Sequence, residues 1–256
     1  MSERPRWWRR LLGSPQAPDI PEPLWQDLLQ QFDFLAQRPP QELARLRELS
    51  REFLARKEFS GAHGLVVSDA MALAIAAQAC LPVLHLGLHW YDDFRGIVVH
   101  PRAMRARREV HDEIGLVHHY AEELSGEAME GGPVTLSWED VGQASAEAGY
   151  NVVIHEFAHK LDMRDGAANG CPPLPSRALR ERWAPTLQTA YDDFVEALEK
   201  AERFGGPRPW LDAYAATAPA EFFAVACEAY FVNRPRLAEN HPALAELFDA
   251  FFRPGT

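Results

Sequence analysis

The amino-acid sequence predicts an α+β fold in which helical segments flank a small mixed β-sheet. Apolar residues repeat at helical spacing near both ends of the chain, whereas short β-rich runs gather between them. The chain has 256 residues, of which 47% are hydrophobic and 25% charged, and this is enough to bury a substantial core. We therefore expect one folded domain over residues 23–256, preceded by an N-terminal tail over residues 1–22.

The predicted tail begins with a basic stretch that contains a tryptophan pair. Prolines follow where an export signal would carry an apolar run, so we expect no signal peptide. From Pro23 to Phe59, leucines repeat at helical spacing, and Pro39-Pro40 divides this region into two predicted helices. A break is expected at residues 59–61, where phenylalanine, serine and glycine follow one another.

The middle of the chain is predicted to be rich in strands. Ser68 or Asp69 can cap a helix over residues 69–80. The apolar stretch that includes this helix continues to Leu88, but proline and glycine interrupt it, so we expect it to be buried rather than to span a membrane. Short apolar or alternating runs predict strands at residues 83–86, 96–100 and 134–138, and the basic run at residues 102–108 is expected to be a surface excursion.

Helical spacing returns in the second half of the chain, where glycines and prolines separate the segments. Helices are predicted over residues 145–162, 179–204, 219–232 and 242–252, with a loop at residues 163–176. The order of helices, strands and helices again is typical of an α+β protein.

The most informative motif is H-E-x-x-H, which lies at residues 155–159 within a predicted helix. His155 and His159 are four residues apart and share one helix face, so both imidazoles can reach a single zinc ion at about 2.0–2.1 Å. Glu156 can approach a water at the metal without binding the metal, which makes it the predicted general base. Chance produces this motif in roughly 3% of chains of this composition. An adjacent apolar stripe supports the helix and consists of Ile154, Phe157, Ala158 and Leu161.

A catalytic zinc site requires a third protein ligand, and the spacing of residues leaves its identity open. The continuation H-x-x-G-x-x-H that is typical of metzincins is absent after His159, so a downstream carboxylate is expected. The candidates are Asp212, Glu221 and Glu228. Glu221 lies in the first turn of a predicted helix, where a carboxylate is favoured, so the spacing favours it over Glu228 without excluding Glu228. Asp162 either orients a ligand imidazole or is solvated at the helix end.

Composition limits the partners that we expect. The net charge of −11 opposes binding to a phosphate backbone, so direct nucleic-acid binding is disfavoured. The three cysteines form no C-x-x-C pair, which argues against a disulfide framework and a zinc knuckle. Free thiols and the absence of an export signal favour a cytoplasmic protein that does not contact a membrane.

Three segments carry a resemblance to a known family: HEFAHKLD at residues 155–162, YAAT at 214–217 and PAEFFAV at 219–225. With the overall order of elements, they resemble the Mlc titration factor A (MtfA) family of zinc metallopeptidases over roughly residues 20–253. The EFFA segment and Tyr214, seven residues before it, are also similar to the catalytic domain of anthrax lethal factor.

The resemblance implies a zincin-like fold of the gluzincin type, with an H-E-x-x-H helix and a C-terminal helical part. In such a site, His155, His159 and Glu221 would bind one Zn²⁺ ion, Glu156 would be the base, and Tyr214 would assist at the oxyanion. The resemblance also implies a cytoplasmic bacterial peptidase with aminopeptidase-like action on small substrates. For the founding branch of the family, it implies contact with the transcriptional repressor Mlc.

We therefore expect a zinc-dependent metallopeptidase that acts on peptides or proteins. The alternative is a regulatory protein that binds and titrates a repressor of the Mlc type, with peptidase activity secondary or latent. Glu156 favours the enzyme, because a purely structural zinc site has no need of a general base. Residues 134–138 are the candidate for an exposed strand to which substrate adds, with an ordinary interior strand as the alternative.

Overall fold

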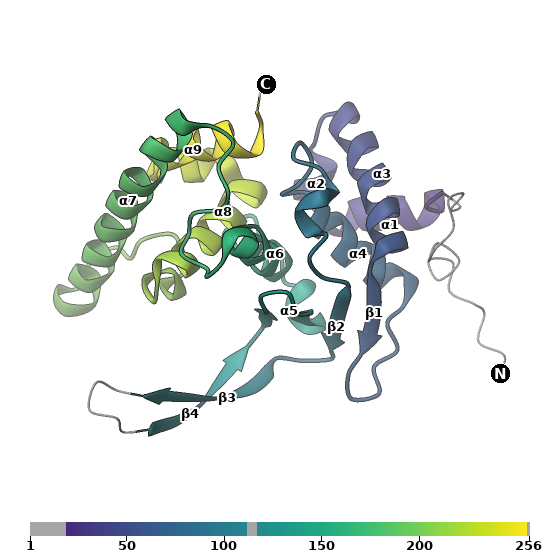
Figure 1. The fold of residues 1–256 in the computed structure, drawn as a ribbon, viewed down its shortest axis with the longest axis horizontal. Coiled ribbons are helices and arrows are strands. Elements are labelled where there is room, and N and C mark those ends of the chain that lie inside the picture. Colours follow the sequence, from purple (N-terminus) through teal and green to yellow (C-terminus); the bar gives the residue numbers. More distant parts are fainter. Residues whose placement is uncertain (1–18, 112–116, 255–256) are drawn as a thin grey trace.

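The computed structural model describes residues 19–111 and 117–254, and Figure 1 shows the N-terminal helices beside the C-terminal helices, with the strands below them. Residues 1–18 of the predicted tail lie outside the described residues. Residues 19–22 pack against the body: Ile20 is 1% exposed, and the Ile20 carbonyl accepts a hydrogen bond from the guanidinium of Arg47. Among the described helices, none is both long enough and apolar enough to cross a membrane.

The N-terminal helices follow the predicted pattern with one additional break. They are α1 (Glu22–Gln31), α2 (Asp33–Ala36), α3 (Pro40–Arg56) and α4 (Asp69–Cys80). The division at Pro39-Pro40 is confirmed, and a second break at Phe32 separates α1 from α2. The Ser68 hydroxyl caps α4 by accepting a hydrogen bond from the Met71 amide at 3.2 Å. Residues 71–80 of α4 are all buried, so this alanine-rich helix fills the space between α3 and the later helices.

One prediction in this part of the chain is incomplete and another is wrong. The helical pattern does break at residues 59–61, but these residues belong to a strand that was not predicted, β1 (Glu58–Gly61), whose partner strand lies far away in the sequence. Residues 83–86 form turns rather than a strand, and the Gly87 amide donates to the Val83 carbonyl at 2.7 Å. Val83 and Leu84 are nevertheless buried, so the apolar run there reflects burial and not an extended backbone. The short 3₁₀ helix η2 (Leu88–Tyr91) follows.

The main sheet has four strands in the order β1-β2-β6-β5, with β2 at Gly96–His100, β6 at Val134–Ser137 and β5 at Gly126–Ala128. The first three strands are parallel and β5 is antiparallel, so the sheet is mixed, as predicted. Both strand predictions, at residues 96–100 and 134–138, are confirmed, although the second ends at Ser137. Of the two alternatives for residues 134–138, the interior strand is confirmed and the exposed edge is wrong, because β6 pairs on both sides and β5 occupies the edge.

A second sheet consists of strands β3 (Met104–His111) and β4 (Val117–Leu124), which pair antiparallel from Met104 opposite Leu124 to His111 opposite Val117. This hairpin projects away from the rest of the molecule in Figure 1. The basic run at residues 102–108, expected as a surface excursion, lies mainly in strand β3 of this hairpin.

The remaining elements are α5 (Trp138–Val141), α6 (Val152–Asp162), η3 (Met163–Asp165), α7 (Arg177–Phe204), η4 (Ala213–Ala216), α8 (Pro219–Asn240) and α9 (Pro242–Phe252). The predicted helices at residues 179–204 and 242–252 are confirmed. Helix α8 continues past residue 232, but its backbone is kinked at Asn233, two residues before Pro235. The helix predicted at residues 145–162 begins only at Val152, because a tight turn joins Ser145 to Tyr150 and Asn151 caps the helix. Helix α6 lies at the centre of the molecule, in contact with α4, α8, β5 and β6.

Candidate metal centre

Helix α6 presents the H-E-x-x-H motif from a fixed position in the core. The side chain of Asn151 caps the helix by accepting a hydrogen bond from the Ile154 amide at 2.9 Å. The predicted apolar stripe is buried throughout, since Ile154, Phe157, Ala158 and Leu161 are all 0% exposed. The stripe holds α6 against the core, and the two histidine side chains remain 12% exposed. Their face of the helix meets the first turn of α8.

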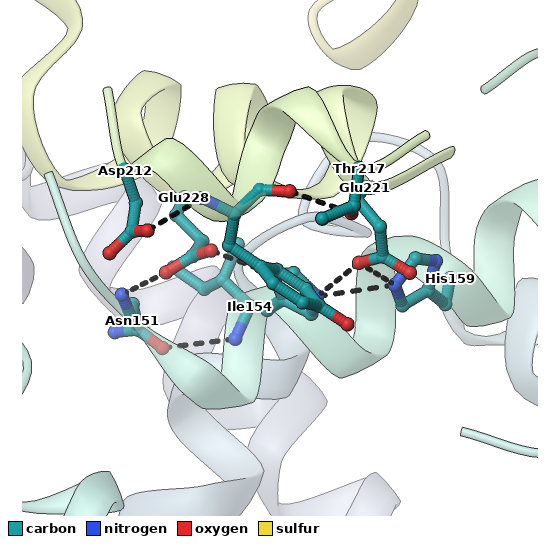
Figure 2. Close-up of polar contacts among 9 residues, drawn as sticks. Asn151, Ile154, His159, Asp212, Thr217, Glu221 and Glu228 are labelled. Carbon is teal, nitrogen blue, oxygen red and sulfur yellow. Dashed lines mark hydrogen bonds and ion pairs between the residues drawn. The ribbon is translucent and has the colours of Figure 1, made fainter. Parts of the chain in front are cut away.

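Three side chains from these two helices converge on one point. The Nε2 atoms of His155 and His159 are 3.2 Å apart, and Oε2 of Glu221 lies 3.0 Å from the first and 3.2 Å from the second. Figure 2 shows Glu221 reaching down from α8 toward His159. Tetrahedral ligands at 2.0–2.1 Å from a zinc ion would be about 3.3 Å apart, so these spacings suit one metal ion. Within the described residues, this is the group of histidines and carboxylates suited to hold a metal.

Glu228 contacts the opposite side of the His155 ring. Its Oε1 lies 2.7 Å from Nδ1 of His155, and its Oε2 accepts a hydrogen bond from the Asn151 amide at 2.5 Å. A carboxylate at Nδ1 holds a hydrogen on that nitrogen, so Nε2, on the side of Glu221, is the nitrogen that can bind a metal. Glu228, one of the three carboxylates considered as third ligand, is therefore placed behind a histidine and not in the centre.

The electrostatic environment separates the two carboxylates of α8. Burial raises the pKa of Glu221, but hydrogen bonds with His155 and His159 outweigh burial, and its pKa lies well below the usual range. Burial is the largest influence on Glu228 and raises its pKa in spite of the contacts with His155 and Asn151. Burial lowers the pKa of His155, but its hydrogen bonds with both glutamates raise that pKa well above 6.5. Glu221 is thus held as a carboxylate, the form that binds a metal.

Glu156 lies beneath the edge strand of the main sheet. It is 5% exposed, and burial raises its pKa to about 6, although the two histidines act in the opposite direction. A Cβ atom on Gly126 of β5 would lie 2.5 Å from Oε1 of Glu156, so only glycine allows the strand to pass this close to the carboxylate. The strand at residues 126–128 was not predicted, because three residues are too few to show an alternation of apolar and polar side chains.

Tyr214 lies at the rim of the centre, in the 3₁₀ helix η4. Its ring centroid is 6.0 Å from that of His155, and its side chain is 37% exposed. Oδ1 of Asp212 accepts a hydrogen bond from the Tyr214 amide at 2.8 Å, and the Thr217 hydroxyl donates to the Tyr214 carbonyl at 2.7 Å. Asp212, also considered as a metal ligand, is therefore the cap of η4 and stands outside the group of three.

The interpretation of Asp162 as a solvated residue at the helix end is wrong. The residue is 0% exposed, and its carboxylate accepts a hydrogen bond from the Gly170 amide at 2.7 Å. Trp183 of α7 donates to the carbonyl of the same glycine at 2.8 Å. Asp162 and Trp183 together hold the loop at residues 163–176 against the body. A backbone amide far along a loop is a partner that helical spacing cannot reveal.

Lys160 is a residue near the centre whose position the sequence did not predict. Its side chain is 0% exposed, and Nζ donates to the carbonyls of Met129 at 2.6 Å and Gly132 at 2.9 Å. The ammonium group also lies 4.5 Å from the centre of the Phe94 ring. Lys160 thus ties the helix of the two histidines to the turn between β5 and β6.

Comparisons with known proteins place the chain in a metallopeptidase family. The family model of the glucose-regulated metallo-peptidase M90 matches residues 5–253. Mlc titration factor A from Salmonella arizonae is 38% identical over 232 residues, which cover 90% of each chain. Mlc titration factor A from Escherichia fergusonii is 36% identical over 239 residues, which cover 93% of this chain and 88% of that one.

Proposed function

The chain belongs to the glucose-regulated metallopeptidase family M90, which confirms the resemblance to Mlc titration factor A, and we propose that it hydrolyses peptide bonds with one zinc ion. The observation that carries the proposal is the convergence of His155, His159 and Glu221, with Glu156 beside them. Two imidazole nitrogens and one carboxylate are the ligand set of a catalytic zinc site of the gluzincin type. They leave a fourth position for water or substrate.

The three side chains can bind zinc because each offers a suitable donor atom, either an imidazole nitrogen or a carboxylate oxygen. Nε2 of His155 is available because Glu228 engages Nδ1, and Glu221 is held ionised by its two histidine neighbours. When bound, zinc would supply the Lewis acidity that polarises a carbonyl and makes a water acidic. The family supports a divalent metal in general, and the nitrogen-rich set favours zinc over magnesium or calcium.

The chain's own residues would then move the proton. The carboxylate of Glu156 accepts a proton from the attacking water as the new C–O bond forms. As the C–N bond breaks, the same carboxylate delivers that proton to the nitrogen of the departing amine. Glu156 is suited to this work because it follows His155 directly on α6 and lines the cavity at the centre. The Tyr214 hydroxyl is proposed to donate a hydrogen bond to the oxyanion that develops on the carbonyl oxygen.

The edge strand β5 is the proposed docking site for the substrate backbone. β5 lies at the end of the sheet order and passes directly over Glu156, so a peptide that adds to its outer side would lie beside the catalytic carboxylate. Three residues of strand can hold only a short stretch of peptide. This supports action on small substrates of the aminopeptidase type, as the family resemblance implied.

The proposal is tested with a panel of amino-acid amides and short peptide amides, incubated with zinc-loaded wild type and Glu156→Gln. We expect a new amine product with the wild type and none with the variant, because glutamine cannot accept the proton. Zinc content is measured in both proteins as a control. Equal product formation by the two proteins would overturn the role of Glu156, and no product from any substrate would overturn the peptidase proposal.

A second function is supported by the name of the curated relatives, Mlc titration factor A. We propose that the chain also binds a transcriptional repressor of the Mlc type, which would place it in the cytoplasm. The test measures binding of purified repressor to the wild type and to Glu156→Gln by calorimetry. Equal affinity would support a binding role independent of catalysis, and no binding to either protein would overturn it.

A further inference from the structure

A cavity of about 230 Å³ opens beside the metal centre on the His155 side. Five parts of the chain build its walls: the start of β5, the turn before α6, helix α6, helix α8, and the beginning of η4 with the residue before it. His155 and Glu156 line it, so whatever occupies the cavity is adjacent to the reacting groups. Its volume is below that of sites for drug-sized ligands, and it suits a single side chain.

The walls combine apolar surface with negative charge. Val152 of α6, Val225 of α8 and the ring of Tyr150 supply the apolar part. Three carboxylates also line the cavity, and no lysine or arginine is among its lining residues in the described part of the chain. The carboxylates are Glu156, Asp212 and Glu228. A flexible side chain with an apolar stem and a cationic end matches this combination.

Of the three carboxylates, Asp212 is the one left for a ligand. Glu228 uses Oε1 on His155 and Oε2 on the Asn151 amide, and Glu156 faces the centre as the proposed base. Asp212 uses Oδ1 to accept from the Tyr214 amide, and its Oδ2 has no hydrogen-bond donor among the described residues. Figure 2 shows Asp212 on the Asn151 side of the centre, away from His159.

The sum of the charges around the centre also favours a cationic ligand. Glu156, Glu221, Glu228 and Asp212 surround the centre, and counted as ionised they exceed the charge of one divalent ion by two. The imidazoles of His155 and His159 are neutral when they bind a metal. The side of the centre that holds the cavity therefore keeps a negative surplus that a cationic group offsets.

We propose that this cavity binds the side chain of a substrate residue next to the scissile bond and selects lysine or arginine through Asp212. The inference rests on the peptidase function proposed above and names its substrate class. Asp212 is the specificity-determining residue, while the valine and tyrosine walls contact the methylene groups of the same side chain.

The first test compares matched substrates. Short peptides carry either lysine or norleucine, which lacks only the amine, on each side of the scissile bond in turn. Asp212→Asn keeps Oδ1 for the Tyr214 amide and removes the charge. Asp192→Asn, at an exposed position of α7 whose carboxylate accepts from Gln188, is the matched control.

We expect the wild type and Asp192→Asn to prefer lysine about five-fold in kcat/KM at one of the two positions, a size typical of a solvent-accessible charge pair. In Asp212→Asn, the ratio between lysine and norleucine should fall to about one. A ratio that is unchanged in this variant, or no lysine preference in the wild type at either position, would overturn the proposal.

A binding measurement separates this proposal from the peptidase proposal. Lysine hydroxamate and norleucine hydroxamate are titrated into zinc-loaded wild type, Asp212→Asn and Asp192→Asn. If the wild type cleaves no peptide, the peptidase function fails, and tighter binding of lysine hydroxamate that is lost only in Asp212→Asn would still support the cavity. Equal binding of the two hydroxamates to the wild type would overturn it.

Discussion

The candidate metal centre has a helical side and a sheet side, and the two supply different groups. On the helical side, α6 and α8 supply the three candidate ligands and Glu228. On the sheet side, β5 and its turn supply backbone that passes close to Glu156 and accepts hydrogen bonds from Lys160. The helical side provides the donor atoms, and the sheet side provides the surface on which we propose that substrate lies. Substitutions on the two sides should therefore differ in their effects on zinc binding and on activity.

The largest effect is expected from removing a donor on the helical side. Glu221→Ala leaves two ligands for zinc, so we expect loss of stoichiometric zinc and of all hydrolysis. Metal content per chain is measured after dialysis at a fixed free zinc concentration. Glu139→Gln, an exposed carboxylate in the first turn of α5, is the control and should retain zinc.

A smaller effect on the metal is expected from Glu228→Gln, which keeps an oxygen near Nδ1 of His155 but removes its charge. Replacing a group that orients a metal ligand typically costs 10–100-fold in metal affinity or activity. We expect zinc affinity to fall by about 10-fold, measured by competition with a chelator. A loss as complete as that of Glu221→Ala would mean that Glu228 is itself a ligand.

On the sheet side, Gly126→Ala should reduce activity without removing zinc. The new Cβ would lie 2.5 Å from Oε1 of Glu156, so either the strand or the carboxylate must move. A small displacement of a catalytic group can reduce the rate by about 100-fold. Gly142→Ala is the control, because the nearest atom to its Cβ is at an ordinary 3.6 Å. Full activity in Gly126→Ala would contradict the close approach of β5 to the base.

The smallest effect is expected at the link between the two sides. Lys160→Met removes the ammonium that binds the Met129 and Gly132 carbonyls while preserving most of the side-chain volume. Because two hydrogen bonds from the buried ammonium to partly buried carbonyls are lost, we expect the free energy of unfolding to fall by about 1–2 kcal/mol, measured by urea denaturation. Lys200→Met on α7 removes an exposed ion pair with Glu196 and should change stability by less than about 0.5 kcal/mol. Equal effects of the two substitutions would show that Lys160 does not tie the helix to the sheet.

The helical side could be predicted because its information is local. His155, Glu156 and His159 lie within five consecutive residues, and helical spacing alone brings the histidines to one face. Glu221 could be favoured through its position at the start of a helix, but spacing could not separate it from Glu228, since both residues contact His155. Their difference, one on Nε2 and the other on Nδ1, depends on how α8 packs against α6.

The sheet side could not be predicted because it depends on contacts between residues that are far apart in the sequence. β5 has three residues, and its position at the edge depends on pairing with β6. The break after α3 was predicted, but strand β1 within it was not, because its partner, β2, lies more than thirty residues away. Residues 83–86 carried an apolar run that burial alone explains. Lysine is usually exposed, so burial of Lys160 could not be predicted. It depends on two backbone carbonyls about thirty residues earlier in the chain.

The most direct test of the central claim is a crystal structure of the zinc-loaded protein, with anomalous diffraction collected at the zinc absorption edge. We expect one anomalous peak per chain, within about 2.0–2.2 Å of Nε2 of His155, Nε2 of His159 and a carboxylate oxygen of Glu221. Glu228 should remain on Nδ1 of His155. A zinc peak bound to Glu228 or to Asp212 would contradict the account. So would a fully occupied zinc site elsewhere in the chain with no peak between the two histidines.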